Sequence, residues 1–290
     1  MAAEGFMLGR VFEAASVILL RRARQGAATH IHDYQVLMVG RPIMAKAFAE
    51  RVVFPGGKVE TSDGELKRTD SKAKSFSNRF QVCAIRELFE ETGVSLTEPK
   101  LKLTDEDIVH WRRRVLTSAD SFNDMMETFQ CNASVNKLKP WSHWITPATG
   151  EHRFNTWFFL AEAPEDAKAS VFPGEMELTD VSWRTPHQTL EAYRNRQLQL
   201  APPQIYTLEQ LCALTTVEDV FKNIPKPQDI KEYLPKIRKN DEGVYTVLLP
   251  GDKDYEGRRK QISTGLHRVE IHPDPELTKV YGAVNATSSL

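Results

Sequence analysis

Cysteine is scarce in this sequence, which contains only Cys83, Cys131 and Cys212. The three residues lie far apart and form no C-x-x-C pair, so a four-cysteine zinc site is excluded. They also provide no even-numbered framework for disulfides. We therefore expect a protein of a reducing compartment.

An excess of charge of either sign is also lacking. Lys plus Arg total 38 and Asp plus Glu total 39, which gives a formal net charge of -1. No global basic field attracts this chain to nucleic acid or to anionic membranes. We therefore expect no nucleic acid and no membrane among its partners, and any polyanion that it binds must be held at a local site.

Long hydrophobic runs are absent as well. The apolar run 14–20 is preceded by Glu13 and followed by Arg21 and Arg22. That length is typical of a strand, and these flanks are not those of a secretory signal. Nothing approaches the length of a membrane span. A cytoplasmic location is expected unless another signal directs the chain elsewhere.

The remaining composition, 41% hydrophobic and 27% charged, is that of a globular protein. β-Branched and aromatic runs predict strands over 15–20, 34–41, 50–57, 141–147, 154–163, 180–186, 243–252 and 266–271. Apolar residues at helical spacing predict helices over 81–93, 104–130, 187–200 and 207–214, with connections over 64–80 and 221–240. Strands and helices in mixed order favour an α/β domain with a mixed sheet.

The helix predicted over 82–92 concentrates negative charge on one side. At 100° per residue, Glu87, Glu90 and Glu91 share one face, and the apolar residues take the opposite side. Three adjacent carboxylates repel one another unless water or a cation screens them, and hard divalent cations such as Mg²⁺ prefer oxygen ligands. Taken alone, the pattern is more typical of a solvated acidic face.

The combination of this helix with the upstream stretch "FPGGKVETSD" (54–63) resembles the signature of the Nudix hydrolases, G-x5-E-x7-R-E-U-x-E-E-x-G-U, in which U is aliphatic. The matching residues are Gly57, Arg86, Glu87, Leu88, Glu90, Glu91, Gly93 and Val94. The resemblance implies an α/β/α sandwich that cleaves a nucleoside diphosphate linked to another moiety. It also implies a cofactor, Mg²⁺ or Mn²⁺, held by the three glutamates.

Within this resemblance, Arg86, Glu87, Glu90 and Glu91 are the catalytic candidates, with Arg86 expected to pair with a glutamate and fix its rotamer. Gly56 and Gly57 begin the phosphate loop, where missing side chains allow close approach of the backbone. An ordinary turn after a proline is the alternative for this glycine pair.

The sequence departs from the signature in two ways. Asp63 stands where the family has Glu, and Glu65 is a rival for that position. Asp63 and Arg86 are 86 − 63 = 23 positions apart where the pattern has 8, so an insertion over about 64–80 interrupts the motif.

An insertion inside the motif resembles the animal peroxisomal coenzyme A diphosphatases of the same superfamily. The stretches that carry this likeness are "HRFNTWFFLAEAP", "WSHWITP", "VSWRTP" and "LLPGD". We therefore expect a single Nudix domain over 10–272, with a motif over 57–94 and a helical insertion over about 104–130, and a C-terminal tail over 273–290.

The resemblance implies hydrolysis of coenzyme A or acyl-coenzyme A to 3′,5′-ADP and 4′-phosphopantetheine or its acyl form. Two alternatives stay open, namely a pyrophosphatase for ADP-ribose, a dinucleotide or a nucleotide sugar, and an inactive nucleotide-binding module. In each case the partner is a small-molecule nucleotide.

Further candidates follow from what this chemistry needs. Trp144, Phe154 and Trp157 could stack on adenine, although aromatic residues at strand spacing are more often core. Glu175 and Glu177 are candidate general bases, and loop carboxylates are the plainer interpretation.

The C-terminal residues Ser288, Ser289 and Leu290 resemble the peroxisomal signal S-K-L without its basic middle residue. With the branch resemblance, they favour a peroxisomal location and an import receptor as a partner.

Overall fold

The structure is a computed structural model. It describes residues 10–23, 31–45, 47–65, 76–148, 152–171, 178–255 and 265–283. The predicted turn at Thr149 and Gly150 lies outside these ranges.

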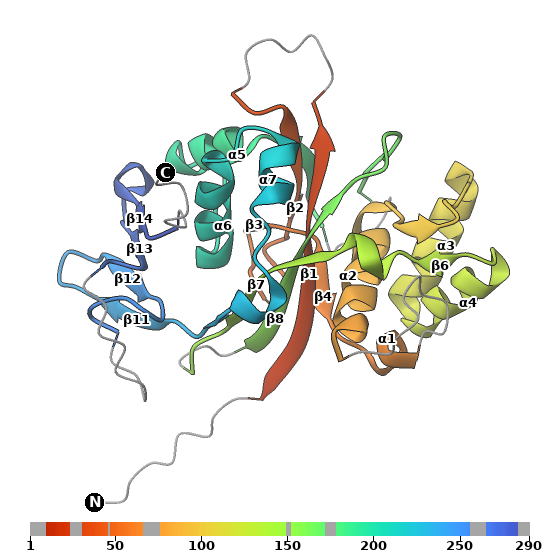
Figure 1. Cartoon of the computed structure of the whole chain (residues 1–290), viewed down its shortest axis with the longest axis horizontal. Helices are drawn as coiled ribbons and strands as arrows, with labels where there is room; N and C mark the ends of the chain where they lie inside the picture. Colours follow the sequence, from red (N-terminus) through yellow and green to blue (C-terminus); the bar gives the residue numbers. More distant parts are fainter. Residues whose placement is uncertain are drawn as a thin grey trace, which may run out of the picture.

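An eight-stranded mixed sheet forms the centre of the molecule (Figure 1). Its strands are β1 (Val11–Arg22), β2 (Tyr34–Gly40), β3 (Val52–Val53), β4 (Gly56–Lys58), β7 (Lys139–Ile145), β8 (Arg153–Glu162), β9 (Asp180–Arg184) and β10 (Glu232–Tyr233). The order along the main path is β10-β7-β8-β1-β2-β3, with β4 pairing β1 and β9 pairing β2. β1 runs parallel to β8 and antiparallel to β2 and β4, so the predicted mixed sheet is confirmed.

Strand β1 is apolar without interruption over most of its length because both faces of the sheet are covered. Successive side chains point to opposite faces. Val17 and Leu19 therefore pack in one hydrophobic cluster, whereas Ile18 and Leu20 pack in the other.

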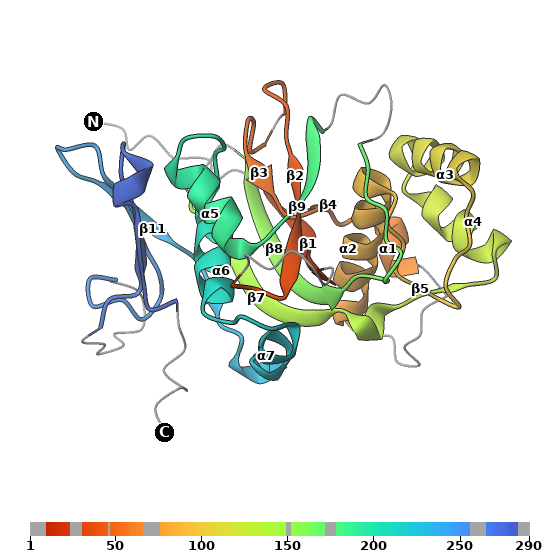
Figure 2. The ribbon, with the colours of Figure 1, turned by 90° about the horizontal axis from the view of Figure 1, so that it is seen from above.

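One face of the sheet is covered by the helices that precede β7. They are α1 (Thr61–Glu65), α2 (Phe76–Thr92), α3 (Asp105–Thr117) and α4 (Asp120–Thr128), accompanied by β5 (Thr97–Glu98), β6 (Asn132–Ala133) and the 3₁₀ turn η1 (Val135–Lys137). α2 packs on β1, and both views place α3 and α4 on its outer side (Figures 1 and 2). The Thr104–Asp107 capping box at the start of α3 is confirmed.

The opposite face is covered by α5 (Pro186–Arg194), α6 (Pro202–Cys212) and α7 (Val217–Lys222). The two helical layers complete the predicted α/β/α sandwich (Figure 2). α6 begins five residues earlier than the helix predicted over 207–214, because Pro202 and Pro203 occupy its first turn, where proline is tolerated.

A second, four-stranded sheet lies beyond α6 (Figure 1). It contains β11 (Lys236–Lys239), β12 (Tyr245–Leu248), β13 (Arg268–Ile271) and β14 (Lys279–Tyr281), with 3₁₀ turns η2 (Pro227–Asp229) and η3 (Pro275–Leu277). The predicted hairpin corresponds to β12 and β13 and is confirmed. Because β14 pairs with β13, regular structure continues beyond residue 272, where we expected a tail to begin.

Two segments expected to be connections contain regular structure. Within 64–80, α1 ends at Glu65 and α2 begins at Phe76, so the helix starts five residues before the predicted position. Within 221–240, the end of α7 and strands β10 and β11 are present. Strands this short, interrupted by prolines, carry too little alternation to be recognised.

Among the described residues, no helix combines the length and apolar character needed to cross a bilayer.

Candidate active site

The predicted carboxylate face of α2 lies beside the glycine strand β4. Arg86, Glu87, Glu90 and Glu91 project from this side of the helix, while residues on its opposite side, such as Leu88, are fully buried. Contacts between α2 and β4, and between α2 and β1, hold this face in place. Amphipathic spacing therefore positions the acidic side chains by burying the apolar ones.

Arg86 is the buried centre of the group. Its Nε lies 2.8 Å from Asp63 Oδ1 and its Nη2 lies 3.1 Å from Asp63 Oδ2, a bidentate ion pair. Nη1 donates to Glu87 Oε1 at 2.9 Å and to Glu90 Oε2 at 3.2 Å. Nη2 also donates to the carbonyl of Lys58 at 2.9 Å, which ties the helix to β4. The expected pairing of Arg86 with a glutamate is thus present, together with a second partner, Asp63, that fixes the guanidinium.

The short helix α1 brings Asp63 to Arg86. Only 3% of Asp63 is exposed, whereas its rival Glu65 is exposed to solvent. Oδ2 of Asp63 also accepts from the backbone N–H of Glu60, which closes the turn leading into α1. The inserted segment therefore leaves the aspartate within reach of the helix.

Burial and neighbouring charges shift the pKa values of Arg86 and Glu87 in opposite directions. Burial alone would lower the pKa of Arg86, but the charge of Glu87 and the hydrogen bonds with Asp63 raise it, so the guanidinium is a permanent cation. Burial raises the pKa of Glu87, and the neighbouring Arg86 opposes that shift. A glutamate held in this way is costly to ionise without a further positive charge.

The two glycines allow two close approaches of the chain. A Cβ on Gly57 would lie 2.5 Å from the carboxyl carbon of Glu87, and a Cβ on Gly56 would lie 2.4 Å from the backbone oxygen of Ala15. Gly56 N–H donates to Glu91 Oε2 at 3.0 Å. The strand can therefore lie against the carboxylates only where side chains are missing.

Arg41, which the signature does not include, provides the second cation of the site. It directly follows β2, and its Nη1 donates to Glu91 Oε1 at 3.2 Å. Its only sequence signal is its position at the end of a buried strand, which does not distinguish it from other arginines. A pairing across fifty positions depends on the fold.

Arg112 from α3 is a second residue that the motif does not reveal. Only 2% exposed, it donates from Nε to the carbonyl of Glu90 at 2.9 Å and from Nη2 to the carbonyl of Glu91 at 2.7 Å. The last carbonyls of a helix have no partner within the helix. The helical insertion thus caps the end of α2 that carries the glutamates.

The donor chemistry of the site fits a divalent cation. Its four carboxylates, from Asp63, Glu87, Glu90 and Glu91, include ion pairs with the guanidiniums of Arg86 and Arg41. Oxygen ligands of this kind suit Mg²⁺ and Mn²⁺. Within the described part of the chain, however, no three His, Cys, Asp or Glu side chains are grouped to hold a metal as they stand.

The predicted stacking residues separate into two sets. Trp144 and Phe154 line an apolar cavity of about 270 Å³ that also includes Gly56, Gly57 and Arg41. Trp157 is not part of its lining and stacks on His143, with ring centroids 4.3 Å apart. Strand alternation explains the difference, because Phe154 and Trp157 are three positions apart on β8 and face opposite sides.

The remaining predicted residues have no described surroundings. Glu175, Glu177, Ser288, Ser289 and Leu290 lie outside the described residues.

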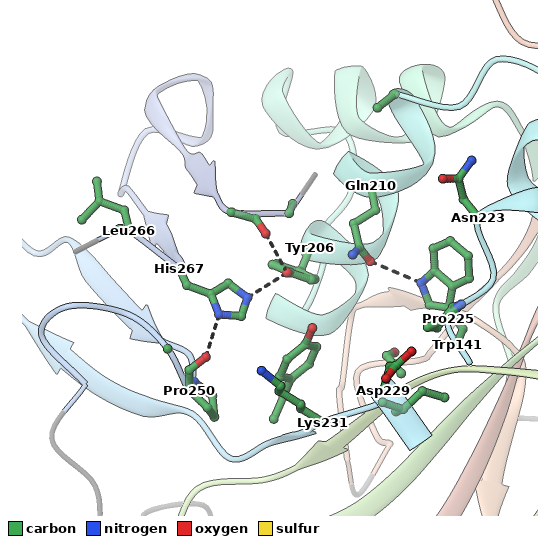
Figure 3. A pocket seen from close by; sticks show the side chains of 18 of the residues that line it. Trp141, Tyr206, Gln210, Asn223, Pro225, Asp229, Lys231, Pro250, Leu266 and His267 are labelled. Carbon is green, nitrogen blue, oxygen red and sulfur yellow. Dashed lines mark hydrogen bonds between the residues drawn. The ribbon is translucent and has the colours of Figure 1, made fainter. Parts of the chain in front are cut away.

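A larger cavity, of about 1000 Å³, lies between α6 and the C-terminal sheet (Figure 3). Tyr206 and His267 meet on its wall, with 2.8 Å between the tyrosine hydroxyl and Nε2, while Nδ1 lies 2.8 Å from the carbonyl of Pro250. Because a carbonyl can only accept a hydrogen bond, Nδ1 of His267 carries the proton. Burial lowers the pKa of this histidine. Arg86 and the three glutamates line neither cavity, but Gly56, Gly57 and Arg41, which contact those glutamates, line the smaller one.

Comparison with known proteins agrees with this geometry. The family model of the NUDT19 Nudix domain matches residues 67–211. The chain is 27% identical to the acyl-coenzyme A diphosphatase NUDT19 of Xenopus laevis, covering 89% of this chain and 86% of the relative. It is 28% identical to the putative nudix hydrolase 7 of Caenorhabditis elegans, covering 83% of this chain and 74% of the relative.

A solved structure, the Nudix hydrolase from Alicyclobacillus acidocaldarius, has the same fold, with a TM-score of 0.63 and 21% identity over 76% of this chain and 100% of that one. Nudix hydrolases generally use divalent metal ions, in keeping with the donor chemistry of the carboxylate group. The chain therefore belongs to the Nudix hydrolases, in the family of the NUDT19 Nudix domain, and is a Nudix diphosphatase.

Proposed function

We propose that this protein hydrolyses the diphosphate linkage of coenzyme A or acyl-coenzyme A, releasing 3′,5′-ADP and 4′-phosphopantetheine or its acyl form. The observation that carries the proposal is an intact carboxylate group, centred on Arg86, in a chain that matches a named acyl-coenzyme A diphosphatase over most of its length. An inactive binding module has no need to keep all of these side chains.

In the reaction, water attacks one phosphorus of the diphosphate and the bridging P–O bond breaks. We assign Glu87, Glu90 and Glu91 to holding Mg²⁺ or Mn²⁺. The bound ion would neutralise phosphate charge and lower the pKa of a water.

The other residues of the site have supporting roles. Arg86 holds Glu87 and Glu90 in place, and Asp63 fixes Arg86. Gly56 and Gly57 keep the loop bare of side chains where the diphosphate must approach. Glu175 and Glu177 stay the candidates for a general base from outside the helix.

The test is a substrate profile of the purified protein with Mg²⁺ or Mn²⁺. Coenzyme A, an acyl-coenzyme A, ADP-ribose, NADH and a nucleotide sugar are supplied separately, and the products are separated by chromatography. We expect preferential release of 3′,5′-ADP from coenzyme A or its acyl form. A preference for ADP-ribose or NADH would contradict the substrate, and no cleavage of any compound would favour a binding module.

We also propose a peroxisomal location, with an import receptor as a partner. The support is the tripeptide Ser288, Ser289 and Leu290 together with the relatives' named substrate. A fluorescent protein fused in front of residues 273–290 should co-localise with a peroxisomal marker, and a Leu290→Asp version should not. Uniform fluorescence from both fusions would refute the signal.

A further inference from the structure

The apolar cavity beside the carboxylate group is assembled from distant parts of the chain. Phe154 and Phe158 of β8 line one side, and Pro202 at the start of α6 lines another. Ile237 of β11 and Val247 of β12 belong to the C-terminal sheet and also line it. Those two positions lie beyond residues 67–211, so this wall is outside the part that matches the family model.

Charge is confined to the end of the cavity that adjoins the carboxylates. Among its described lining residues, Arg41 is the only charged one. Its Nη1 contacts Glu91, and its Nε is buried without a hydrogen-bond partner among the described residues. A guanidinium with unused donor capacity at this position suits a phosphate oxygen.

The two halves of the proposed substrate differ sharply in charge. The nucleotide half carries a 3′-phosphate in addition to the diphosphate, whereas the pantetheine arm is uncharged and contains amide groups. Burying a phosphate among apolar side chains without a second cation is strongly unfavourable. The cavity is therefore complementary to the uncharged arm.

Two residues of the wall also carry polar groups that lack partners in the part of the chain that the structure describes. Trp144 and Gln204 are more than nine-tenths buried, and neither the indole Nε1–H nor the amide Oε1 has a hydrogen-bond partner there. Buried polar groups normally find a partner. A donor and an acceptor are the complements of the C=O and N–H of an amide, the group that the pantetheine arm contains.

We infer that this cavity binds the pantetheine arm, with Arg41 against the phosphate at the end of that arm and the nucleotide half outside. The inference rests on the proposed function and specifies which half of the substrate the cavity selects. It also gives the C-terminal sheet a part in specificity, because Ile237 lies in the path of the arm.

The test uses a charge placed in the cavity. Ile237 is 47% exposed, so Ile237→Glu should fold, and thermal unfolding checks this. The matched control is Ile31→Glu, which puts the same change on an isoleucine, 67% exposed, that does not line the cavity. Calorimetry then measures binding of 4′-phosphopantetheine and of 3′,5′-ADP to the wild type and both variants.

We expect Ile237→Glu to weaken the binding of 4′-phosphopantetheine by about tenfold or more, because an ionised carboxylate would be desolvated against the uncharged arm. Binding of 3′,5′-ADP should change by less than about twofold, as for an exposed site distant from the change, and Ile31→Glu should affect neither ligand. If the variant binds 3′,5′-ADP more weakly and 4′-phosphopantetheine as the wild type does, the nucleotide half occupies the cavity. Equal effects on both ligands, or no effect on either, would also overturn the inference.

This design separates the two proposals. If Ile237→Glu hydrolyses coenzyme A as the wild type does, the cavity assignment is refuted and the proposed function stands. If the wild type does not hydrolyse coenzyme A but binds 4′-phosphopantetheine in a way that depends on Ile237, the proposed function is refuted and the cavity assignment stands.

Discussion

The carboxylate group and the apolar cavity meet at Gly56 and Gly57 but are built in contrasting ways. The first draws its charged residues mainly from one helix and ties them to Arg86 and Arg41 by direct ion pairs. The second is formed by residues from seven strands, several connections and the start of one helix, with one cation at its edge. The contrast indicates that a local motif performs the chemistry, whereas the assembled fold selects the substrate.

The largest expected effect concerns catalysis by the carboxylate group. Glu91→Gln or Glu87→Gln keeps the shape of the side chain and removes a charge that would hold the metal. We expect kcat/KM for coenzyme A to fall at least about a thousandfold, since metal ions supply several kcal/mol of charge stabilisation. The thermal midpoint should stay near that of the wild type. Full activity in both variants would refute the metal assignment.

Removal of the central cation should destabilise the fold. Arg86→Met leaves Asp63 buried and unpaired, which costs about 3–5 kcal/mol of the free energy of unfolding. The matched control is Arg79→Met on the same helix, because Arg79 pairs with the half-exposed Glu13 and such pairs contribute about 0–1 kcal/mol. Urea unfolding measures both variants. Equal losses would show that Arg86 is an ordinary surface partner.

The junction between the two regions can be tested through its glycines. Gly57→Ala places a methyl group 2.5 Å from the carboxyl carbon of Glu87, so we expect a fall in kcat of about 10–100-fold, as for residues that orient metal ligands. Gly64→Ala is the control, since among the described residues its Cβ would meet only Arg79, at 3.9 Å. If Gly64→Ala lowers the rate as much as Gly57→Ala, the close approach to Glu87 does not matter.

The smallest expected effect concerns the C-terminal sheet, which carries Ile237, and the pH dependence of its stability. Asp252 is buried, and although burial would raise its pKa, hydrogen bonds from Arg268 and from backbone N–H groups lower it. An unfolded aspartate titrates at about 3.9, so the contribution of Asp252 to stability is present above that pH and is lost as the pH falls through the lower folded pKa.

Asp252→Asn should therefore lower the free energy of unfolding by about 1–3 kcal/mol near pH 7, the contribution of hydrogen bonds to charged groups. The difference from the wild type should shrink as the pH falls below about 3.9. Chemical unfolding at several pH values measures this difference. A difference that stays constant down to the acid limit would exclude the ionised carboxylate as its source.

The sequence predicts the first region well because its information is local. Helical spacing alone places Glu87, Glu90 and Glu91 on one face, and the signature adds Asp63 across the insertion. Arg41 and Arg112 could not be found in this way, because their contacts with α2 depend on how the fold brings distant segments together. Trp157 could have been set apart from Phe154 by strand parity, since an odd spacing places two residues on opposite faces.

The cavity is harder to predict from the sequence because its residues come from segments that are distant in the chain. Ile237 reaches it from a strand of four residues in a segment rich in charge and proline, where local pattern is weak. Val247 lies in the predicted hairpin, but nothing in its local pattern assigns it to this wall. Only the pairing of β11 with β12 places them in one wall.

The most direct measurement is Mn²⁺ binding followed by electron paramagnetic resonance in the wild type, Glu91→Gln and Ile237→Glu. The account predicts that Glu91→Gln loses at least about tenfold in Mn²⁺ affinity, as expected when a carboxylate ligand is removed. It predicts that Ile237→Glu binds Mn²⁺ as the wild type does, because that residue belongs to the cavity alone. Unchanged Mn²⁺ affinity in Glu91→Gln would contradict the assignment of the chemistry to the carboxylate face of α2.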